Sequence, residues 1–425
     1  MKIVVVGAGP SGLIVAHTLA RKGHKIVLLE RQKNESMSFC GEMIDFSKVN
    51  DEIKELFNKT LRSSTSTITI RIVDDSYNVI YNFPIKTNRT GLIDSAKFRN
   101  LLKKEFENEN VTFMFNSTVK NVVTGEKNVS VEISSPEGNK NITADLIIGA
   151  DGVKSTIRRI LLGKDIRSLP SMRKHYIIRN YQEGDFGFYL MGPFKFGYGW
   201  VYPGEKVENG INANIGVGYI SKYIKKPLRV MLEEFIAGLK ANGMEIEEID
   251  EEEGSLGNLI PYSGLVYPGG GKRFLLVGDA MGTVNALVGG GVCSSINSSY
   301  IAAEYISGKI SKEDYDFSDW YDYIASRKEG KELNRSAFIL YAAEKIYARR
   351  KDFFEILKAY IEKFADDDLI LKLADGDLSR KDMIKYVLKH PLMFLEIIYI
   401  VGPLKSRKAL KEFRKETPYI KKYKE

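Results

Sequence analysis

The first thirty residues alternate between buried-strand and helix patterns. Residues 3–6 form a continuous apolar run rich in β-branched side chains, which predicts a strand buried on both faces. Apolar positions then recur at helical spacing up to residue 20, and Gly23 ends the predicted helix. A second short apolar run, residues 25–29, finishes on Glu30. This order predicts a strand–helix–strand unit of an α/β fold.

The same texture returns twice further along the chain. An apolar run over residues 146–149 leads into Asp151-Gly152 and a helix that Ser155 or Thr156 opens. Another run, residues 274–277, leads into Gly278-Asp279, the glycines at 289–291 and a helix that continues to about residue 306. The pattern therefore predicts three strand-to-helix junctions, each marked by glycine.

Other periodicities fill the intervals. Residues 66–73 and 78–83 resemble a hairpin, residues 94–107 a helix, and residues 112–115, 119–123 and 129–133 the strands of a small meander. Residues 168–267 change to alternating strands rich in aromatic side chains, with an amphipathic helix at 228–242. Residues 315–399 are almost wholly helical by period. We interpret residues 168–267 as part of a second domain inserted in the first.

Composition narrows the class of protein. The chain has 425 residues, of which 44% are hydrophobic and 28% charged, as in a folded globular protein. It contains no 18-residue apolar run, and its start enters a strand without a cleavable signal. Two cysteines, Cys40 and Cys293, are too few for a disulfide framework or an iron–sulfur ligand set, and no metal site is predicted. We expect a cytoplasmic protein.

The positive charge is concentrated at one end. The formal net charge is +8, and residues 403–425 hold nine Lys or Arg against three Glu, a net of +6. The excess is thus a tail, not a face spread over the fold, and no nucleic-acid partner is expected. Residues 391–404 are apolar except for Glu396, and they are too few to span a bilayer. This end is either a buried helix with a solvated tail or a peripheral anchor for anionic lipids.

The glycines of the first junction point to a dinucleotide. Gly7 permits the tight turn, Gly9 lets a pyrophosphate approach the backbone, and Gly12 lets the helix pack closely on the strand. The helix start at Pro10 and Ser11 offers N–H groups and a positive dipole to an anion. Glu30, with Arg31 beside it, ends the second strand, where an acidic side chain accepts a hydrogen bond from a ribose hydroxyl. This fingerprint alone does not separate a nicotinamide cofactor from FAD.

The third junction favours FAD. We expect Asp279 to face the ribityl chain. We expect the N–H groups of Gly290, Gly291 and Val292 to face the negative charge that develops on the reduced flavin. An isoalloxazine ring needs such an arrangement because its reduced form is anionic, whereas a nicotinamide does not. Asp151 and Arg158 could hold the pyrophosphate side of the cofactor or brace their own turn.

One further segment is a candidate for contact with the ring system of the cofactor. Cys40-Gly41 follows the second strand and suits close contact with a flat ring system. The alternative for Cys40 is a small buried hydrophobic residue.

Together the three junctions resemble the p-hydroxybenzoate hydroxylase-like FAD superfamily over about the first 310 residues. The matching stretches are Gly7 to Gly12 with Glu30, Gly149-Ala150-Asp151-Gly152 through Arg158, and Gly278-Asp279-Ala280 through Gly291. Within that superfamily, Cys40-Gly41-Glu42 and Tyr198-Gly199-Trp200-Val201-Tyr202-Pro203 resemble the geranylgeranyl reductase family, whose second motif is Tyr-x-Trp-x-Phe-Pro. Met281 and Ala286 depart from the family pattern, as does Ser95 after Asp94, where Arg99 is a candidate substitute for a flavin contact.

The resemblance implies a function. The family saturates carbon–carbon double bonds of isoprenoid chains, such as those of archaeal ether lipids or geranylgeranyl diphosphate. It implies that Cys40 and Gly41 contact the flavin and that Tyr198, Trp200, Tyr202 and Pro203 shape the lipid cavity. Candidate proton donors are Cys40, Tyr202 and a flavin-bound water. The electron donor, NADPH or a ferredoxin-like protein, stays open because no second dinucleotide fingerprint occurs.

Two other functions fit parts of the pattern. An aromatic-ring monooxygenase of the same superfamily shares the Asp151-Gly152 motif. A flavin-bearing electron carrier that docks to a membrane quinone would use the basic tail.

The predicted fold class is α/β: a Rossmann-type FAD-binding domain, an interleaved α+β substrate domain built mainly on an antiparallel sheet, and a helical C-terminal region. The predicted boundaries are residues 1–165 with 266–310, residues 166–265, and residues 311–425. Residues 66–93 are a candidate further part of the substrate sheet.

Overall fold

A largely parallel sheet carries the three strand-to-helix junctions. In this computed structural model, residues 1–33, 41–105, 107–249, 256–349, 352–355 and 357–358 are described. The sheet order is β19–β20–β12–β1–β2–β8, with β20 through β8 parallel and β19 antiparallel at the edge. The strands are β1 (Lys2–Val6), β2 (Lys25–Leu29), β8 (Val111–Met114), β12 (Leu146–Gly149), β19 (Gly270–Gly271) and β20 (Phe274–Leu276). Carboxyl ends of parallel strands share one edge, so the turns after β1, β12 and β20 lie together there.

Strand β8 lies elsewhere than predicted. The pattern assigned residues 112–115 to the meander, but β8 pairs in parallel with β2, from Ile26 with Val111 to Leu29 with Met114. The assignment was wrong because a local apolar pattern identifies a strand but not its partner. The meander consists of β9 (Thr118–Thr124), β10 (Val129–Ser135) and β11 (Gly138–Ala144).

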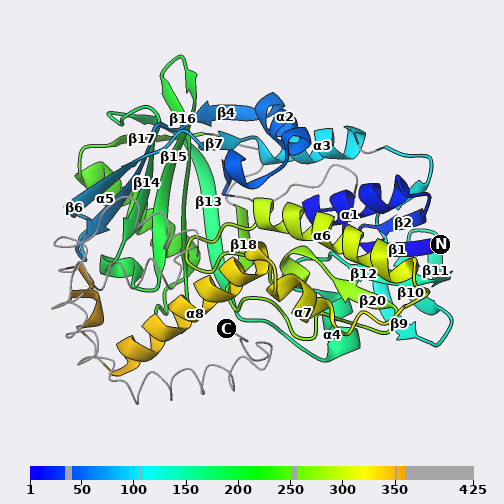
Figure 1. Cartoon of the computed structure of the whole chain (residues 1–425). Coiled ribbons are helices and arrows are strands. Elements are labelled where there is room, and N and C mark those ends of the chain that lie inside the picture. Colours follow the sequence, from blue (N-terminus) through cyan, green and yellow to red (C-terminus); the bar gives the residue numbers. More distant parts are fainter. Residues whose placement is uncertain (34–40, 106, 250–255, 350–351, 356, 359–425) are drawn as a thin grey trace.

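Helices α1 (Pro10–Ala20) and α6 (Val292–Ile310) lie side by side along one face of the parallel sheet (Figure 1). Helix α4 (Thr156–Leu162) packs against β12 and β9. The strands between these layers are buried on both faces, with Val4, Ile147 and Leu275 fully enclosed. This burial explains why the strands have continuous apolar sequences and no alternation.

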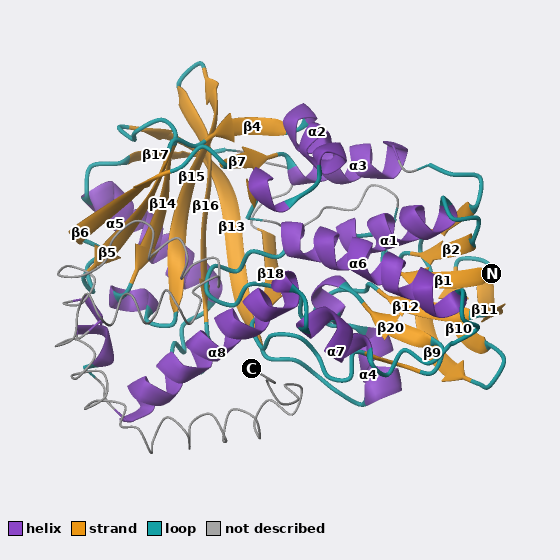
Figure 2. Cartoon of the chain, in the orientation of Figure 1, coloured by secondary structure: helices purple, strands orange, loops and turns teal. Residues whose placement is uncertain are grey.

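A larger, mainly antiparallel sheet forms the other end of the molecule (Figure 2). Its order is β17–β13–β16–β15–β14–β5–β6, with β18 also on β13, and the pair β14–β5 is parallel. The strands are β5 (Thr67–Val73), β6 (Val79–Lys86), β13 (Ser168–Arg179), β14 (Asp185–Leu190), β15 (Gly197–Val207), β16 (Gly210–Tyr219), β17 (Glu245–Glu248) and β18 (Leu256–Pro261). Strand β5 therefore pairs with β14 of the aromatic-rich segment, and β6 pairs with β5 at the edge of the sheet.

One face of this larger sheet is covered by helix α5 (Leu228–Ala241), whose Phe235 and Leu239 join a core with Ile178 and Val201. The short 3₁₀ helix η2 (Gly192–Phe194) adds Phe194 to that core. Side chains alternate along a strand, so Tyr198, Trp200 and Tyr202 of β15 point to the opposite face. That opposite face turns toward the parallel-sheet domain.

A small sheet, β3 (Met43–Asp45), β7 (Thr90–Ile93) and β4 (Leu61–Ser64), joins the two ends. It lies near the 3₁₀ helix η1 (Phe46–Lys48), helix α2 (Asp51–Lys59) and helix α3 (Ser95–Glu105). Strand β4 continues into β5 of the larger sheet, whereas β3 follows the segment that contains Gly41. The small sheet thus links a cofactor-side loop to the larger sheet.

Helices α7 (Trp320–Ala325) and α8 (Lys328–Arg349) follow α6 and bridge both ends of the molecule (Figure 1). The apolar segment 391–404 and the basic tail lie outside the described residues. Among the described residues, no helix is both long and apolar enough to cross a bilayer. The arrangement as a whole agrees with the predicted α/β class.

Candidate cofactor and substrate site

The three glycine-marked junctions interlock at the carboxyl edge of the parallel sheet. A Cβ on Gly7, which has φ +104°, would lie 2.3 Å from the Ala150 carbonyl oxygen. A Cβ on Gly278 would lie 2.1 Å from Ser11 Oγ. The second and third junctions also touch, since Arg158 Nη1 donates to the Ala280 carbonyl at 3.0 Å. These contacts bring three segments that are far apart in sequence into one site.

Gly9 and Gly12 stand in opposite surroundings. A Cβ on Gly12 would lie 1.8 Å from the Gly7 carbonyl oxygen, so Gly12 serves close packing. A Cβ on Gly9 would meet nothing within 4 Å. Gly9 is also the N-cap of α1 and supplies no side-chain cap to the helix, which begins at Pro10. The open space beside a helix N-terminus fits the approach of a pyrophosphate.

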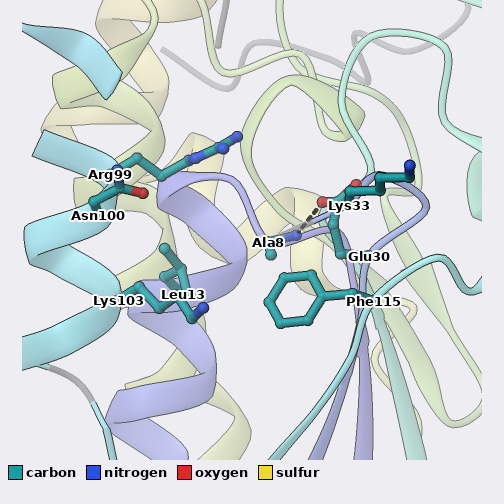
Figure 3. A pocket seen from close by; sticks show the side chains of 8 residues that line it. All are labelled: Ala8, Leu13, Glu30, Lys33, Arg99, Asn100, Lys103 and Phe115. Atoms are coloured by element: carbon teal, nitrogen blue, oxygen red, sulfur yellow. Dashed lines mark hydrogen bonds between the residues drawn. The ribbon is translucent and has the colours of Figure 1, made fainter. Parts of the chain in front are cut away.

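Glu30 closes the first junction and lines a small surface pocket (Figure 3). Its Oε2 accepts the Ala8 N–H at 2.9 Å and its Oε1 accepts the Gln32 N–H at 2.9 Å. Arg99 reaches toward the same pocket from α3, and burial lowers the pKa of its guanidinium. Arg31 is exposed and does not line the pocket. The sequence did not indicate Ala8, Leu13, Lys33, Asn100, Lys103 and Phe115 as further lining residues.

Asp151 and Arg158 brace their own turn. The Asp151 carboxylate accepts hydrogen bonds from the Ser155 hydroxyl and the Thr156 backbone N–H, both at 2.6 Å, at the start of α4. Burial raises the pKa of this carboxyl. The fully buried Arg158 donates to the Val153 carbonyl at 2.6 Å as well as to Ala280. The geometry thus favours the bracing role over a direct hold on the pyrophosphate.

Asp279 lies in the short 3₁₀ helix η3 (Gly278–Ala280), just before the third group of glycines. Its Oδ1 would be 3.6 Å from a Cβ on Gly291, which is the N-cap of α6 and provides no side-chain cap. Burial raises the pKa of Asp279 to about 6. Gly290 and Val292, the first residue of α6, flank this position. An acceptor and a helix N-terminus therefore adjoin, as the sequence predicted.

The Cys40-Gly41 segment is placed only in part. Cys40 lies outside the described residues. Among the residues that the structure describes, a Cβ on Gly41 would meet nothing within 4 Å. Cys293, at the start of α6, is buried and donates to the Asp45 carbonyl at 3.5 Å.

Glu42 directly follows Gly41, and the sequence pattern indicated no role for it. Only 3% of its surface is exposed, and its Oε2 accepts His175 Nε2 at 2.9 Å and Asn214 Nδ2 at 3.0 Å. Arg173 Nη2 lies 3.5 Å from Oε1 and Arg62 Nη1 lies 3.4 Å from Oε2. Hydrogen bonding to His175 and the charge of Arg173 outweigh burial and lower the pKa of Glu42 to about 2. No local pattern could have indicated this cluster, because its members come from four separate segments.

The predicted substrate residues form a largely buried aromatic cluster on the face of β15 opposite α5, which is turned toward the cofactor site. Ring centroids of Tyr198 and Trp200 are 5.8 Å apart, and those of Trp200 and Tyr202 are 6.0 Å apart. Phe188 of β14 lies 5.4 Å from both tyrosines. Phe186 and Leu92 complete the buried part of the cluster, and Met43 packs against it.

This aromatic cluster contacts the cofactor-side loops directly. Tyr198 donates its hydroxyl to the Val288 carbonyl at 2.6 Å, next to the glycines at 289–291. Trp200 Nε1 donates to Asn214 Oδ1 at 2.8 Å, and Asn214 in turn donates to Glu42. Pro203, at a bulge in β15, accepts the Ser63 hydroxyl at 2.5 Å. The aromatic cluster therefore borders the loops on which the flavin contacts were predicted.

Comparison with known proteins shows what the chain is similar to. The profile of an FAD binding domain matches residues 1–169. Digeranylgeranylglycerophospholipid reductase 1 of Methanococcoides burtonii is 25% identical over 97% of both chains. The digeranylgeranylglycerophospholipid reductase of Methanothrix thermoacetophila is 25% identical over 94% of this chain and 99% of its own.

The chain is an FAD-dependent oxidoreductase related to these reductases. In fold, the flavoprotein is also similar to a geranylgeranyl bacteriochlorophyll reductase-like protein from Thermoplasma acidophilum. That structure has a TM-score of 0.70 and 21% identity, with 94% of this chain and 98% of that chain covered. The predictions of FAD, of the α/β fold class and of an oxidoreductase are thereby confirmed.

The residues of this flavoprotein fit FAD. The free space at Gly9, the Glu30 pocket and the uncapped start of α6 beside Asp279 lie along one edge of the sheet. We assign the pyrophosphate to Gly9, Pro10, Ser11 and the α1 N-terminus, and the adenosine ribose to Glu30 with Arg99 beside it. We assign the ribityl chain and ring to Asp279, Gly290, Gly291, Val292 and Gly41. These residue assignments stay proposals.

Proposed function

We propose that this flavoprotein reduces carbon–carbon double bonds of geranylgeranyl chains, carried by an archaeal-type ether lipid or by geranylgeranyl diphosphate. The observation that carries the proposal is the aromatic cluster of β14 and β15 in hydrogen-bonded contact with the cofactor-side loops. Aromatic side chains hold a flexible polyene by burial of apolar surface, without fixing a polar group. The names of the relatives that match nearly the whole chain support the same substrate class.

When bound, reduced FAD supplies a hydride to one alkene carbon. The protein positions the reactants. Glycine-lined helix starts hold the cofactor without side-chain cations, and Tyr198, Trp200 and Tyr202 hold the isoprenoid beside it. The second alkene carbon needs a proton, for which Cys40 and Tyr202 remain our proposed donors. A Cys40→Ala variant with full reductase turnover would remove Cys40 from this role.

The test is anaerobic incubation of the chemically reduced, FAD-loaded protein with geranylgeranyl diphosphate or a geranylgeranylated glycerolipid, followed by mass spectrometry. Mass gains in steps of two hydrogens are expected. A protein that binds reducible flavin but leaves the lipid mass unchanged would contradict the proposal. NAD(P)H-driven oxygen uptake stimulated by phenols would instead indicate the aromatic monooxygenase.

The electron source and the membrane contact belong to the same proposal. We propose that NADPH or a ferredoxin-like protein reduces the flavin, and stopped-flow reduction with each donor distinguishes the two. We further propose that residues 391–404 and the basic tail bind anionic lipid surfaces, because apolar burial and charge attraction add. Deletion of residues 403–425 should then release the protein from anionic vesicles, and unchanged binding would dismiss the contact.

A further inference from the structure

Glu42 gathers hydrogen-bond donors from both ends of the molecule. His175 and Arg173 belong to β13 and Asn214 to β16, so three of its partners stand on the larger sheet. Arg62 comes from β4 of the small sheet, and the Ser95 hydroxyl at the start of α3 lies 3.4 Å from Oε1. The backbone of Glu42 is held as well, because its carbonyl accepts the Ile93 N–H at 3.0 Å. One carboxylate thus fixes a loop against four different elements, β13, β16, β4 and α3.

This arrangement is costly for the fold alone. Taking a carboxylate and two guanidinium groups out of water carries a large desolvation penalty, which ion pairing offsets only where the geometry is good. Glu42 also has φ +67°, a left-handed conformation that is unfavourable for a non-glycine residue. Replacement of a whole set of buried charged groups by apolar residues is often neutral or stabilising, whereas removal of one partner alone destabilises the fold. The retained charge therefore calls for a role other than stability.

The neighbours of Glu42 in the chain and in space suggest that role. Gly41, the predicted ring contact, precedes it directly, and Met43, which packs against the aromatic cluster, follows it. Through Asn214 the same carboxylate is linked to the indole N–H of Trp200. The buried Glu42 carboxylate therefore belongs to the flavin-side loop and is also linked, through Asn214, to the aromatic cluster.

We propose that Glu42 is a positioning residue that fixes the Gly41 loop and the Trp200 side chain relative to each other, and thereby the flavin ring relative to the isoprenoid chain. The inference rests on the proposed function for the identity of the chain that Trp200 holds. This role requires no contact of Glu42 with the flavin or with the isoprenoid chain. Misplacement of reacting atoms by about 1 Å can cost about 100-fold in rate, so a positioning residue has a measurable effect.

The experiment compares three variants of the full-length, FAD-loaded protein. Glu42→Gln keeps the side-chain size and removes the charge. Asn214→Ala cuts the link to Trp200 and leaves the Glu42 ion pairs in place, so it decides the matter if Glu42→Gln does not fold.

Asp185→Asn is the matched control. Asp185 is 2% exposed and pairs with Arg71 and, at 2.5 Å, with the Thr69 hydroxyl. It shares the larger sheet but lies on the α5 face, because Phe186 and Phe188 point to the other side of β14.

Two readouts are taken. The first is the visible absorbance spectrum of the bound flavin with and without geranylgeranyl diphosphate, which needs no turnover. The second is the rate at which that lipid reoxidises the reduced protein. We expect Glu42→Gln to change the flavin spectrum and to slow reoxidation about 100-fold, and Asn214→Ala about 10-fold. Asp185→Asn should lower the unfolding temperature but leave the spectrum as in the wild type and the rate within about 3-fold.

The inference is overturned if Glu42→Gln and Asn214→Ala keep the wild-type spectrum and rate, or if Asp185→Asn produces the same losses. The last result would mean that any weakening of the larger sheet has this effect. If the wild type does not reduce the lipid, the proposed function fails. A spectral change in Glu42→Gln and Asn214→Ala but not in Asp185→Asn would still support the positioning role.

Discussion

At the scale of single residues, substitutions of Gly9 and Gly12 distinguish an effect on FAD binding from an effect on the packing of the fold. Gly9→Ala places a methyl group in open space, so the free energy of unfolding should change by less than about 1 kcal/mol. The methyl group would stand in the path of the pyrophosphate, and we expect the FAD dissociation constant to rise at least about 10-fold. Gly12→Ala should instead destabilise the apoprotein by about 1–3 kcal/mol, because the methyl group meets the Gly7 carbonyl. Titration calorimetry with FAD and denaturant unfolding measure both, and equal effects of the two variants would contradict the distinction.

We expect FAD binding to depend on pH through Asp279. Burial raises its pKa to about 6, so the carboxyl keeps its proton to a higher pH than the ordinary value of 3.8. The ionised form accepts a ribityl hydroxyl best, and binding therefore favours loss of the proton. FAD affinity should rise with pH up to about 6, by at most about tenfold per pH unit, and level off above it. Asp279→Asn cannot titrate, so a slope that persists in this variant would assign the effect to another group.

At the scale of elements, β15 joins the substrate side to the start of α6. Tyr198, on the face of β15 turned toward the cofactor site, holds the Val288 carbonyl, and burial raises the pKa of its hydroxyl, which thus remains a donor. The loop that follows has its own turn hydrogen bonds, from the Gly289 N–H to the Asn285 carbonyl at 2.9 Å and from the Asn285 N–H to the Gly290 carbonyl at 3.0 Å. Tyr198 adds a hydrogen bond to this loop from a strand about ninety residues earlier in the chain.

Tyr198→Phe removes that hydrogen bond and keeps the ring. We expect a loss of about 1 kcal/mol in the free energy of unfolding, with faster amide hydrogen exchange at residues 288–293. Amide exchange of α5, on the opposite face of the larger sheet, provides the internal control. Uniformly faster exchange over both regions would show that Tyr198 supports the whole sheet and not this loop.

At the scale of the whole molecule, the two large sheets are joined through shared polar contacts. Arg62 bonds both Glu42 and Glu205, Tyr198 reaches Val288, and Asn334 of α8 accepts the Leu265 N–H at 3.1 Å. We expect the cofactor domain and the larger sheet to unfold together. FAD at 100 times its dissociation constant should then stabilise the entire protein by about 2.7 kcal/mol.

Thermal unfolding followed by flavin fluorescence and by far-ultraviolet circular dichroism tests this coupling. The two signals should give one midpoint, which rises with FAD concentration. Two separate midpoints, of which only one responds to FAD, would show that the sheets unfold independently.

The sequence by itself determined the elements whose physics is local. Glycine spacing around a helix start, continuous apolar strands and period-2 aromatic residues predicted the parallel FAD-binding sheet, the antiparallel second sheet and the FAD cofactor. Those features depend on residues within about one turn or one strand of each other. The site assignments at Gly9, Glu30 and Asp279 are consistent with the geometry and stay proposals.

Only the tertiary structure decided which segments meet. It placed β8 in the parallel sheet, turned Asp151 and Arg158 into braces for their own turn, and collected Glu42, His175 and Asn214 around one buried carboxylate. The physical reason is common to all three. A strand pattern does not specify its partner, and the charge of a buried carboxylate depends on donors that arrive from strands more than a hundred residues away.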